Sequence, residues 1–167
     1  MELRKLSEAD ADELARAVTD SLALLRPWAP WAANGYDAET AAEFLREAAQ
    51  EWDKGTAFPH AITVDGAIVG VVTAMRREEA DLVEIGYWLH HGHTGRGHAT
   101  AASAELVELA FALDGVRRVQ IWHDEANAAS SGVPRRLGFT QVERRTPPRQ
   151  PATGSRVGVD VVWELRR

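Results

Sequence analysis

Residues 82–103 read LVEIGYWLHHGHTGRGHATAAS. Residues 82–89 predict a buried strand, and the apolar residues that recur after Gly97 predict a helix packed on a sheet. Between them, Gly95 and Gly97 permit the positive φ angles of a tightly curled loop and leave no side chain between the backbone and a ligand. The first N–H groups of a helix lack partners, and the helix dipole is positive there. The junction therefore favours phosphate binding, with an ordinary strand-to-helix turn as the alternative.

Two familiar phosphate motifs do not occur in this sequence. It has no Gly-x-x-x-x-Gly-Lys-Ser/Thr stretch, and the Gly-x-Gly-x-x-Gly pattern fails because Thr100 stands three residues after Gly97. We therefore expect neither a P-loop nor a Rossmann dinucleotide site.

Length and composition predict one ordinary globular domain over residues 1–167, with 45% hydrophobic and 26% charged residues. The net charge of −6 argues against a nucleic-acid surface. No apolar run is long enough for a membrane span, and the N-terminus does not resemble a signal peptide, so we expect a cytoplasmic protein without membrane contact. The absence of cysteine excludes disulfides, thiolate metal sites and a cysteine nucleophile.

The order of predicted elements is that of a mixed α/β sheet with helices on both faces. A Gly at residue 55 should end a helix, Asp65-Gly66 should form a hairpin turn, and two prolines should break the aromatic segment 24–36. A loop at 146–154 should connect the last two strands. Strands are expected at 2–6, 58–64, 67–75, 82–89, 116–123, 140–145 and 157–165, and helices at 8–20, 38–52, after Gly97 and at 127–137.

A second group of small polar residues lies at the start of the last predicted helix. Asn127, Ser130 and Ser131 are typical helix caps, and the same residues could also face a site. Pro134 would damage a helix interior, so it fits best if the helix starts near Ser130.

These two stretches together resemble the GCN5-related N-acetyltransferases. The similarity rests on Glu84 to Leu89, on the loop 93–100 and on the Asn-x-x-Ser…Leu-Gly-Phe pattern of 127–139. Residues 25–31 and 162–165 are also similar to the Rim-type branch, which acetylates N-terminal amines of ribosomal proteins. The resemblance implies a mixed, mostly antiparallel sheet of about seven strands that splays between the fourth and fifth strands, with about four helices on both faces.

The resemblance also implies acetyl-CoA as the acetyl donor. Its pyrophosphate would lie on the backbone amides of 93–99, and its pantetheine arm would pair with the backbone of 88–90. Gly92 departs from the family pattern, which has Gln or Arg there. The histidines of this loop are expected to tune the positive potential rather than to bind a metal. The cofactor-binding residues implied are Trp88, Leu89, His90, His93, Thr94, Gly95, Arg96, Gly97, His98, Ala99, Asn127 and Ser130.

For catalysis, the resemblance points to Glu84 and Ser130. Pro134 stands where many members carry a tyrosine acid, and Ser130 resembles the Rim-type substitute that hydrogen-bonds the sulfur. Glu84, between two apolar residues, should face a cleft or carry a raised pKa through partial burial, and it would accept the amine proton directly or through water. A solvent-facing strand residue or a salt bridge is the alternative. His123 is the other candidate base, with a structural role as its alternative.

The acceptor pocket is expected to include Trp28, Trp31, Tyr36, Glu84 and His123. The function implied is direct acetyl transfer to a primary amine in a ternary complex, with a protein N-terminal α-amine favoured. A small-molecule amine or antibiotic is the first alternative acceptor, and a non-catalytic acetyl-CoA sensor or partner module is the second alternative. Relatives of this type are often dimers, so a homodimer is included among the expectations.

Overall fold

The computed structural model describes residues 1–150 and 154–167. In this part of the chain seven strands form one mixed sheet in the order β1-β2-β3-β4-β5-β7-β6. Every neighbouring pair is antiparallel except β4 and β5. The strands are β1 (Glu2–Lys5), β2 (Ala57–Val64), β3 (Ala67–Arg76), β4 (Leu82–Leu89), β5 (Arg118–Asp124), β6 (Thr140–Arg145) and β7 (Asp160–Arg166).

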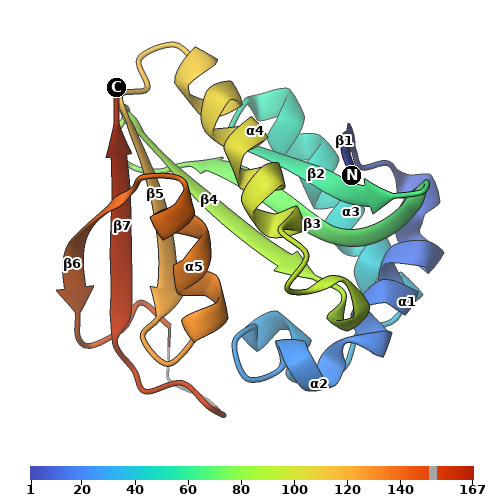
Figure 1. Cartoon of the computed structure of the whole chain (residues 1–167). Helices are drawn as coiled ribbons and strands as arrows, with labels where there is room; N and C mark the ends of the chain where they lie inside the picture. The colour runs from blue at the N-terminus through green and yellow to red at the C-terminus, as the bar shows by residue number, and fades with distance from the viewer. Residues whose placement is uncertain (151–153) are drawn as a thin grey trace.

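Helices cover both faces of the sheet, as predicted (Figure 1). The core on one face joins residues of α4 to Val83 and Ile85 of β4, and the core on the other face joins residues of α1 and α3 to Val71 of β3. The helices are α1 (Ala11–Asp20), α2 (Leu22–Leu25), α3 (Ala38–Lys54), α4 (His98–Ala112) and α5 (Ala128–Arg136), with 3-10 turns at Glu8–Asp10, Pro30–Ala32 and His91–His93. None of these described helices has the length and apolar character needed to span a bilayer.

Local turn chemistry explains several of these boundaries. Gly55 ends α3 in the left-handed conformation, with φ 68°, and the β2–β3 hairpin turns at Asp65 and Gly66, which both have positive φ. The predicted hairpin and the predicted end of α3 near Gly55 are therefore confirmed.

The parallel pair β4–β5 is short, and this positions the site. Its register runs from Leu82 opposite Arg118 to Glu84 opposite Gln120, after which the two strands are no longer paired. Residues 85–89 of β4 and 121–124 of β5 continue past that point, and the strands diverge (Figure 1). This β4–β5 opening is the predicted splay between the fourth and fifth strands.

The predicted starts of two strands are wrong. β5 begins at Arg118 rather than 116, because the N–H groups of Arg117 and Arg118 donate to the carbonyl of Asp81 before the ladder starts. β7 begins at Asp160 rather than 157, because the N–H groups of Val157 and Gly158 donate to the Asp124 carboxylate instead of to a strand. The loop predicted at 146–154 falls partly outside the described residues.

The predicted start of α5 near Ser130 is also wrong. Asn127 caps the helix, and its side-chain oxygen accepts the N–H of Ser130 at 3.2 Å, so the helix begins at Ala128. Pro134 therefore lies inside the helix and not in its first turn.

Candidate active site

The loop between β4 and α4 supplies free backbone donors beside the β4–β5 opening. Gly95 and Gly97 have φ angles of 72° and 82°, which confirms the positive φ predicted for both. Within residues 1–150 and 154–167, no acceptor is recorded for the N–H groups of residues 95–100. Because these donors lie at the positive end of α4, the loop can bind an anion.

The first half of the same loop uses its donors internally. The N–H of His91 donates to Ser21 Oγ at 3.0 Å, the N–H of Gly92 to His90 Nδ1 at 3.1 Å, and the N–H of His93 to the His90 carbonyl at 2.9 Å. The backbone amides left free for an anion therefore begin after His93, so His93 itself can contribute only its side chain.

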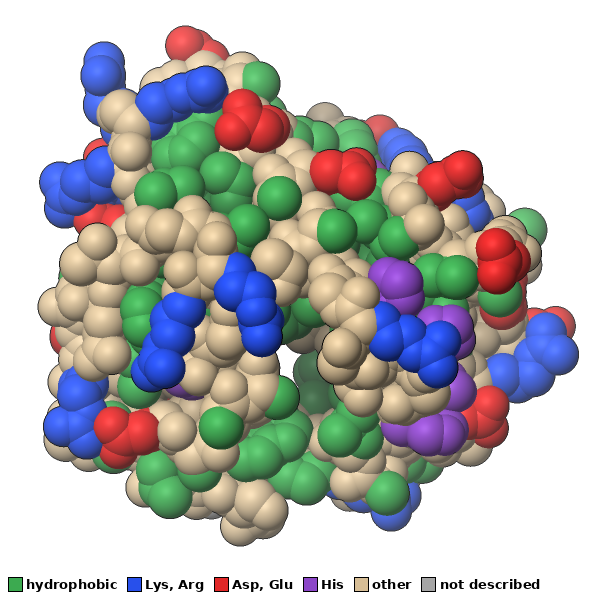
Figure 2. Space-filling view, in the orientation of Figure 1, with side chains coloured by type: hydrophobic (Ala, Val, Ile, Leu, Met, Phe, Trp, Pro, Cys, Tyr) green, Lys and Arg blue, Asp and Glu red, His purple; other side chains and the backbone are tan. Residues whose placement is uncertain are grey.

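Four histidines surround this loop. The ring centroids of His90 and His91 are 4.3 Å apart, those of His90 and His93 are 5.8 Å apart, and those of His93 and His98 are 6.0 Å apart. Burial and neighbouring cationic groups hold the pKa values of His90 and His93 below their usual range. His93 Nδ1 is buried and has no hydrogen-bond partner among the residues that the structure describes. Figure 2 shows histidine side chains gathered on one side of a hollow that separates this loop from α5.

Asn127 and Ser130 lie at the N-terminus of α5. The Asn127 side-chain oxygen is occupied by the helix cap, whereas its amide nitrogen keeps its donors. The carbonyl of Ser130 accepts the hydroxyl of Tyr87 at 3.0 Å. Tyr87 comes from the diverging part of β4, so this hydrogen bond crosses the β4–β5 opening.

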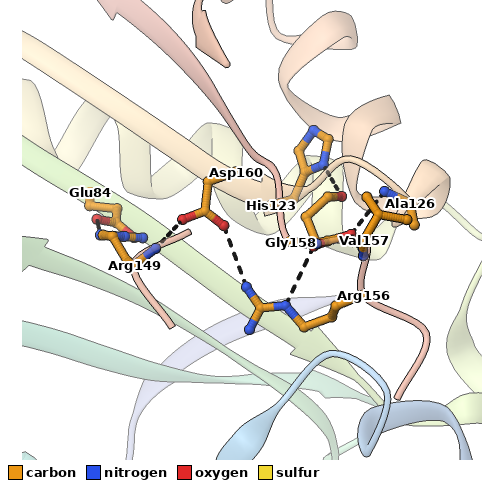
Figure 3. Close-up of polar contacts among 9 residues, drawn as sticks. Glu84, His123, Ala126, Arg149, Arg156, Val157, Gly158 and Asp160 are labelled. Carbon is orange, nitrogen blue, oxygen red and sulfur yellow. Dashed lines mark hydrogen bonds and ion pairs between the residues drawn. The ribbon is translucent and has the colours of Figure 1, made fainter. Parts of the chain in front are cut away.

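Glu84 lies at the start of the opening, and the predicted rise in its pKa is wrong. The residue is only 7% exposed. Burial alone would raise the pKa of its carboxyl, but hydrogen bonds from Arg149 and Arg77 lower it below the usual range. Arg149 reaches its two oxygens at 2.7 and 2.9 Å (Figure 3). Arg77 Nε lies 2.8 Å from Oε2. The geometry therefore matches the ion-pair alternative.

His123 uses both ring nitrogens within the fold. Nδ1 lies 2.8 Å from the Asp124 carbonyl, and Nε2 accepts the indole N–H of Trp163 at 2.9 Å. Burial lowers the pKa of its imidazole, which keeps the ring neutral. With neither nitrogen free, the structural alternative describes His123 better than the role of a base or acceptor contact.

The aromatic segment packs beside the opening, on the sheet face that carries α1 and α3. The rings of Trp31 and Tyr36 are 5.6 Å apart, and those of Trp31 and Trp88 are 6.1 Å apart. Trp31 is 47% exposed, and Trp28 is partly exposed on the preceding turn. Burial raises the pKa of Tyr36 to about 12. The structure thus brings Trp31, Tyr36 and Trp88 together into one aromatic wall.

Two residues at the site were missed by the sequence reasoning. Arg149 lies in a proline-rich loop with no recognisable pattern, and its partner Glu84 is 65 residues away. Tyr87 lies in the quoted strand, but only the position of α5 reveals what its hydroxyl contacts. Neither contact has a sequence signal beyond the residue type.

The family model for the acetyltransferase (GNAT) domain matches residues 1–140, so the chain belongs to the GNAT acetyltransferases. One similar protein is "Putative ribosomal N-acetyltransferase YdaF" of Bacillus subtilis (strain 168). It is 29% identical over 144 residues, which cover 83% of this chain and 77% of the relative. Membership in this family makes acetyl-CoA the co-substrate of the chain.

Two solved structures show the same fold. RimL, a ribosomal L7/L12 α-N-protein acetyltransferase in complex with coenzyme A, superposes with a TM-score of 0.89 at 21% identity, covering 98% of this chain and 92% of the other. The microcin C7 self-immunity acetyltransferase MccE, in complex with acetyl-CoA and AMP, gives a TM-score of 0.90 at 19% identity, covering 99% and 91%. The similarity to these two structures therefore spans essentially the whole chain.

Proposed function

We propose that this protein transfers the acetyl group of acetyl-CoA directly to a primary amine while both are bound, with a protein N-terminal α-amine as the favoured acceptor. The observation that carries the proposal is the run of N–H groups at 95–100, which have no acceptor in the described part of the chain and lie beside the β4–β5 opening. A pyrophosphate fits such donors, and an extended arm fits the unpaired edge of a diverging strand.

The chain's own groups would hold the co-substrate at three places. The amides after Gly95 and the side chain of Arg96 would bind the pyrophosphate. The backbone of 88–90 would pair with the pantetheine arm, and the Asn127 amide would donate to it. Acetyl-CoA supplies an activated acetyl thioester, and holding it beside the amine converts a bimolecular encounter into a local reaction.

Ser130 is the proposed partner of the departing sulfur. Its hydroxyl lies in the first turn of α5, where the helix dipole also favours a developing negative charge. A thiolate is a modest leaving group, so a hydrogen bond from a hydroxyl can serve where a stronger acid is missing. Pro134, which replaces the tyrosine common in the family, supplies no such group.

The contacts of Glu84 favour a positioning role over that of a base. Because both of its oxygens accept guanidinium N–H groups and its pKa is lowered, we assign Glu84 to holding Arg149 beside the opening. The proton of the attacking amine would then pass to water. Direct or water-mediated proton transfer to Glu84 stays as the competing assignment, and the variants described in the Discussion separate the two.

The preference for a protein N-terminus is supported by the similarity to the ribosomal-type relative and by the open aromatic wall. Trp31 is exposed at the end of that wall, which leaves room for a chain that extends away from its reacting amine. A flat small amine could also stack on Trp31, Tyr36 and Trp88, so a small-molecule acceptor is the second candidate. A cytoplasmic location belongs to the favoured proposal.

Thiol release from acetyl-CoA tests these candidates. The panel should contain peptides with free N-termini, the same peptides with acetylated N-termini, small polyamines and aminoglycosides, and a reaction without acceptor. We expect the free peptides alone to accelerate release and to become acetylated. Acceleration by small amines only would favour the second candidate. Tight binding of acetyl-CoA with no acceleration by any amine would favour a non-catalytic sensor.

A further inference from the structure

The backbone N–H and the backbone carbonyl of Ser130 are both hydrogen-bonded to side chains. Its N–H donates to the Asn127 side chain at 3.2 Å, and its carbonyl accepts the Tyr87 hydroxyl at 3.0 Å. Asn127 precedes Ser130 in the same turn, but Tyr87 belongs to β4 on the other side of the opening (Figure 1). The first turn of α5 is therefore tied to the strand that diverges from β5.

Pro134 explains why the carbonyl of Ser130 has no donor within its own helix. In a regular helix the carbonyl of residue 130 would accept the N–H of residue 134, four positions later. Proline has no N–H, and its ring pushes against the carbonyl four residues before it. Pro134 is inside α5 and almost completely buried, and it offers no N–H to the carbonyl of Ser130. Tyr87 supplies the missing donor.

We propose that Tyr87 and Pro134 act together as a positioning pair, which fixes Ser130 and Asn127 across the opening from the part of β4 that holds the pantetheine arm. The inference rests on the proposed function for its catalytic consequence but not for the hydrogen bond itself. It assigns to Pro134, which lies inside α5 where many members of the family carry a tyrosine, the specific role of leaving one carbonyl without its helical donor.

The surroundings of Tyr87 suit a fixed donor. Its side chain packs against the core on the α4 face, and burial raises the pKa of its phenol well above the usual range. The hydroxyl therefore stays protonated through the range in which the enzyme would work. Its single recorded acceptor among the described residues is the Ser130 carbonyl.

A double-mutant cycle with Tyr87→Phe and Pro134→Ala tests the pair. Tyr87→Phe removes the donor, and Pro134→Ala restores a helical N–H that competes for the same carbonyl. The first readout is amide hydrogen exchange in the first turn of α5, which needs no ligand. The second is the dissociation constant for acetyl-CoA, measured by calorimetry. We expect Tyr87→Phe alone to increase the amide exchange rate and the dissociation constant each about threefold to tenfold, which is the range set by one net hydrogen bond.

In the Pro134→Ala background, the same Tyr87→Phe change should alter both quantities less than twofold. The proposal would be overturned if Tyr87→Phe had the same fold effect with and without Pro134→Ala. It would also be overturned if Tyr87→Phe alone left the amide exchange rates of α5 unchanged. Ser131→Ala is the matched control, because Ser131 Oγ donates to the Ala128 carbonyl in the same turn without touching Tyr87. It should leave acetyl-CoA affinity within twofold. If acetyl-CoA does not bind the unmodified protein, the proposed function fails, and the exchange cycle still decides this inference.

Comparison of kcat with KM distinguishes a positioning role of Tyr87 from a general loss of stability. With an acceptor identified by thiol release, Tyr87→Phe should lower kcat several-fold while leaving KM for the amine unchanged. In a Ser130→Ala protein, which keeps the carbonyl but lacks the hydroxyl, the same Tyr87→Phe change should have no further effect on kcat. A Tyr87→Phe effect of equal size in both backgrounds would show that Tyr87 does not act through the Ser130 hydroxyl.

Discussion

Arg149 forms a two-point ion pair with Glu84, with Nη1 and Nη2 at 2.7 and 2.9 Å from its two oxygens. The Arg149 guanidinium also lies 3.7 Å from the ring centroid of Trp122 on β5. Its backbone N–H donates to Asp160 at 2.8 Å (Figure 3). One arginine thus joins β4, β5 and the start of β7 at the point where the parallel strands separate.

We predict that Glu84→Gln and Arg149→Gln each lower the free energy of unfolding by about 1–3 kcal/mol. Glu84→Gln leaves two guanidinium groups without their carboxylate, and Arg149→Gln leaves the buried carboxylate with Arg77 as its remaining ion-pair partner. The double variant should lose less than the sum. Arg144→Gln breaks the solvent-exposed pair with Glu125 and serves as the control, and it should change the free energy of unfolding much less than either of the other single variants. Urea unfolding of the unmodified protein and the four variants provides the measurement.

Turnover of the same variants distinguishes an ion-pair role from that of a base. If Glu84 acts through Arg149, the two single variants should lose activity to a similar extent, and the double variant should be no worse. Glu84→Gln abolishing acetyl transfer while Arg149→Gln keeps it would instead identify Glu84 as the proton acceptor.

Acid should destabilise the protein through the same carboxylate. The pKa of Glu84 is lowered from 4.5 in the folded state, so its contribution to stability is fully present above about pH 4.5 and is lost as pH falls through the lower folded value. In Glu84→Gln the free energy of unfolding should therefore fall less steeply below pH 4.5. Parallel curves for the two proteins, measured by urea unfolding at several pH values, would contradict this assignment.

Gly97→Ala should weaken acetyl-CoA binding as well as folding. Gly97 has φ 82°, which costs a residue with a side chain about 1 kcal/mol, and relaxing that strain would turn the free amides of the loop away. Gly115 has φ 78° at the far end of α4, so Gly115→Ala controls for strain alone. Both variants should have lower melting temperatures, whereas only Gly97→Ala should raise the calorimetric Kd. Equal affinities would refute the anion role of this loop.

The histidines should make acetyl-CoA affinity depend on pH. Arg96, His91, His98 and Asp65 are the charged or titratable groups near His93, and its lowered pKa keeps it neutral at pH 7. Protonation of His93 near a bound pyrophosphate should tighten acetyl-CoA binding about threefold to tenfold between pH 7.5 and 5.5. One charge pair at ~4 Å in water is worth about 1 kcal/mol. His93→Asn should flatten this dependence in calorimetry, and the distant His60→Asn should not. An equally steep dependence in His93→Asn would exclude His93.

Much of the fold could be predicted from the sequence because its signals are local. The hairpin turn, the end of α3 near Gly55 and the loop after β4 all depend on positive φ angles, which glycine and, less often, aspartate adopt, and such residues are visible in the sequence. The divergence of β4 from β5 could be anticipated only through resemblance to a family, since nothing within either strand ends the pairing at Glu84 and Gln120.

The electrostatics of the site could not be predicted in the same way. The direction of the Glu84 pKa depends on Arg149, which reaches it from a loop far along the chain. His123 resembles a candidate base in sequence, and only the positions of Trp163 and the Asp124 carbonyl show that both of its nitrogens are engaged. Pro134 fits a first turn only if the helix starts near Ser130, and the Asn127 cap that starts the helix at Ala128 is a typical capping residue that the sequence alone does not distinguish from a site residue.

Backbone amide chemical shifts during titration with acetyl-CoA test the central claim most directly. The account predicts that the largest changes fall on residues 95–100 and on 85–90, where free N–H groups and the unpaired edge of β4 meet the opening. Changes confined to other parts of the chain, or no binding at millimolar acetyl-CoA, would contradict it.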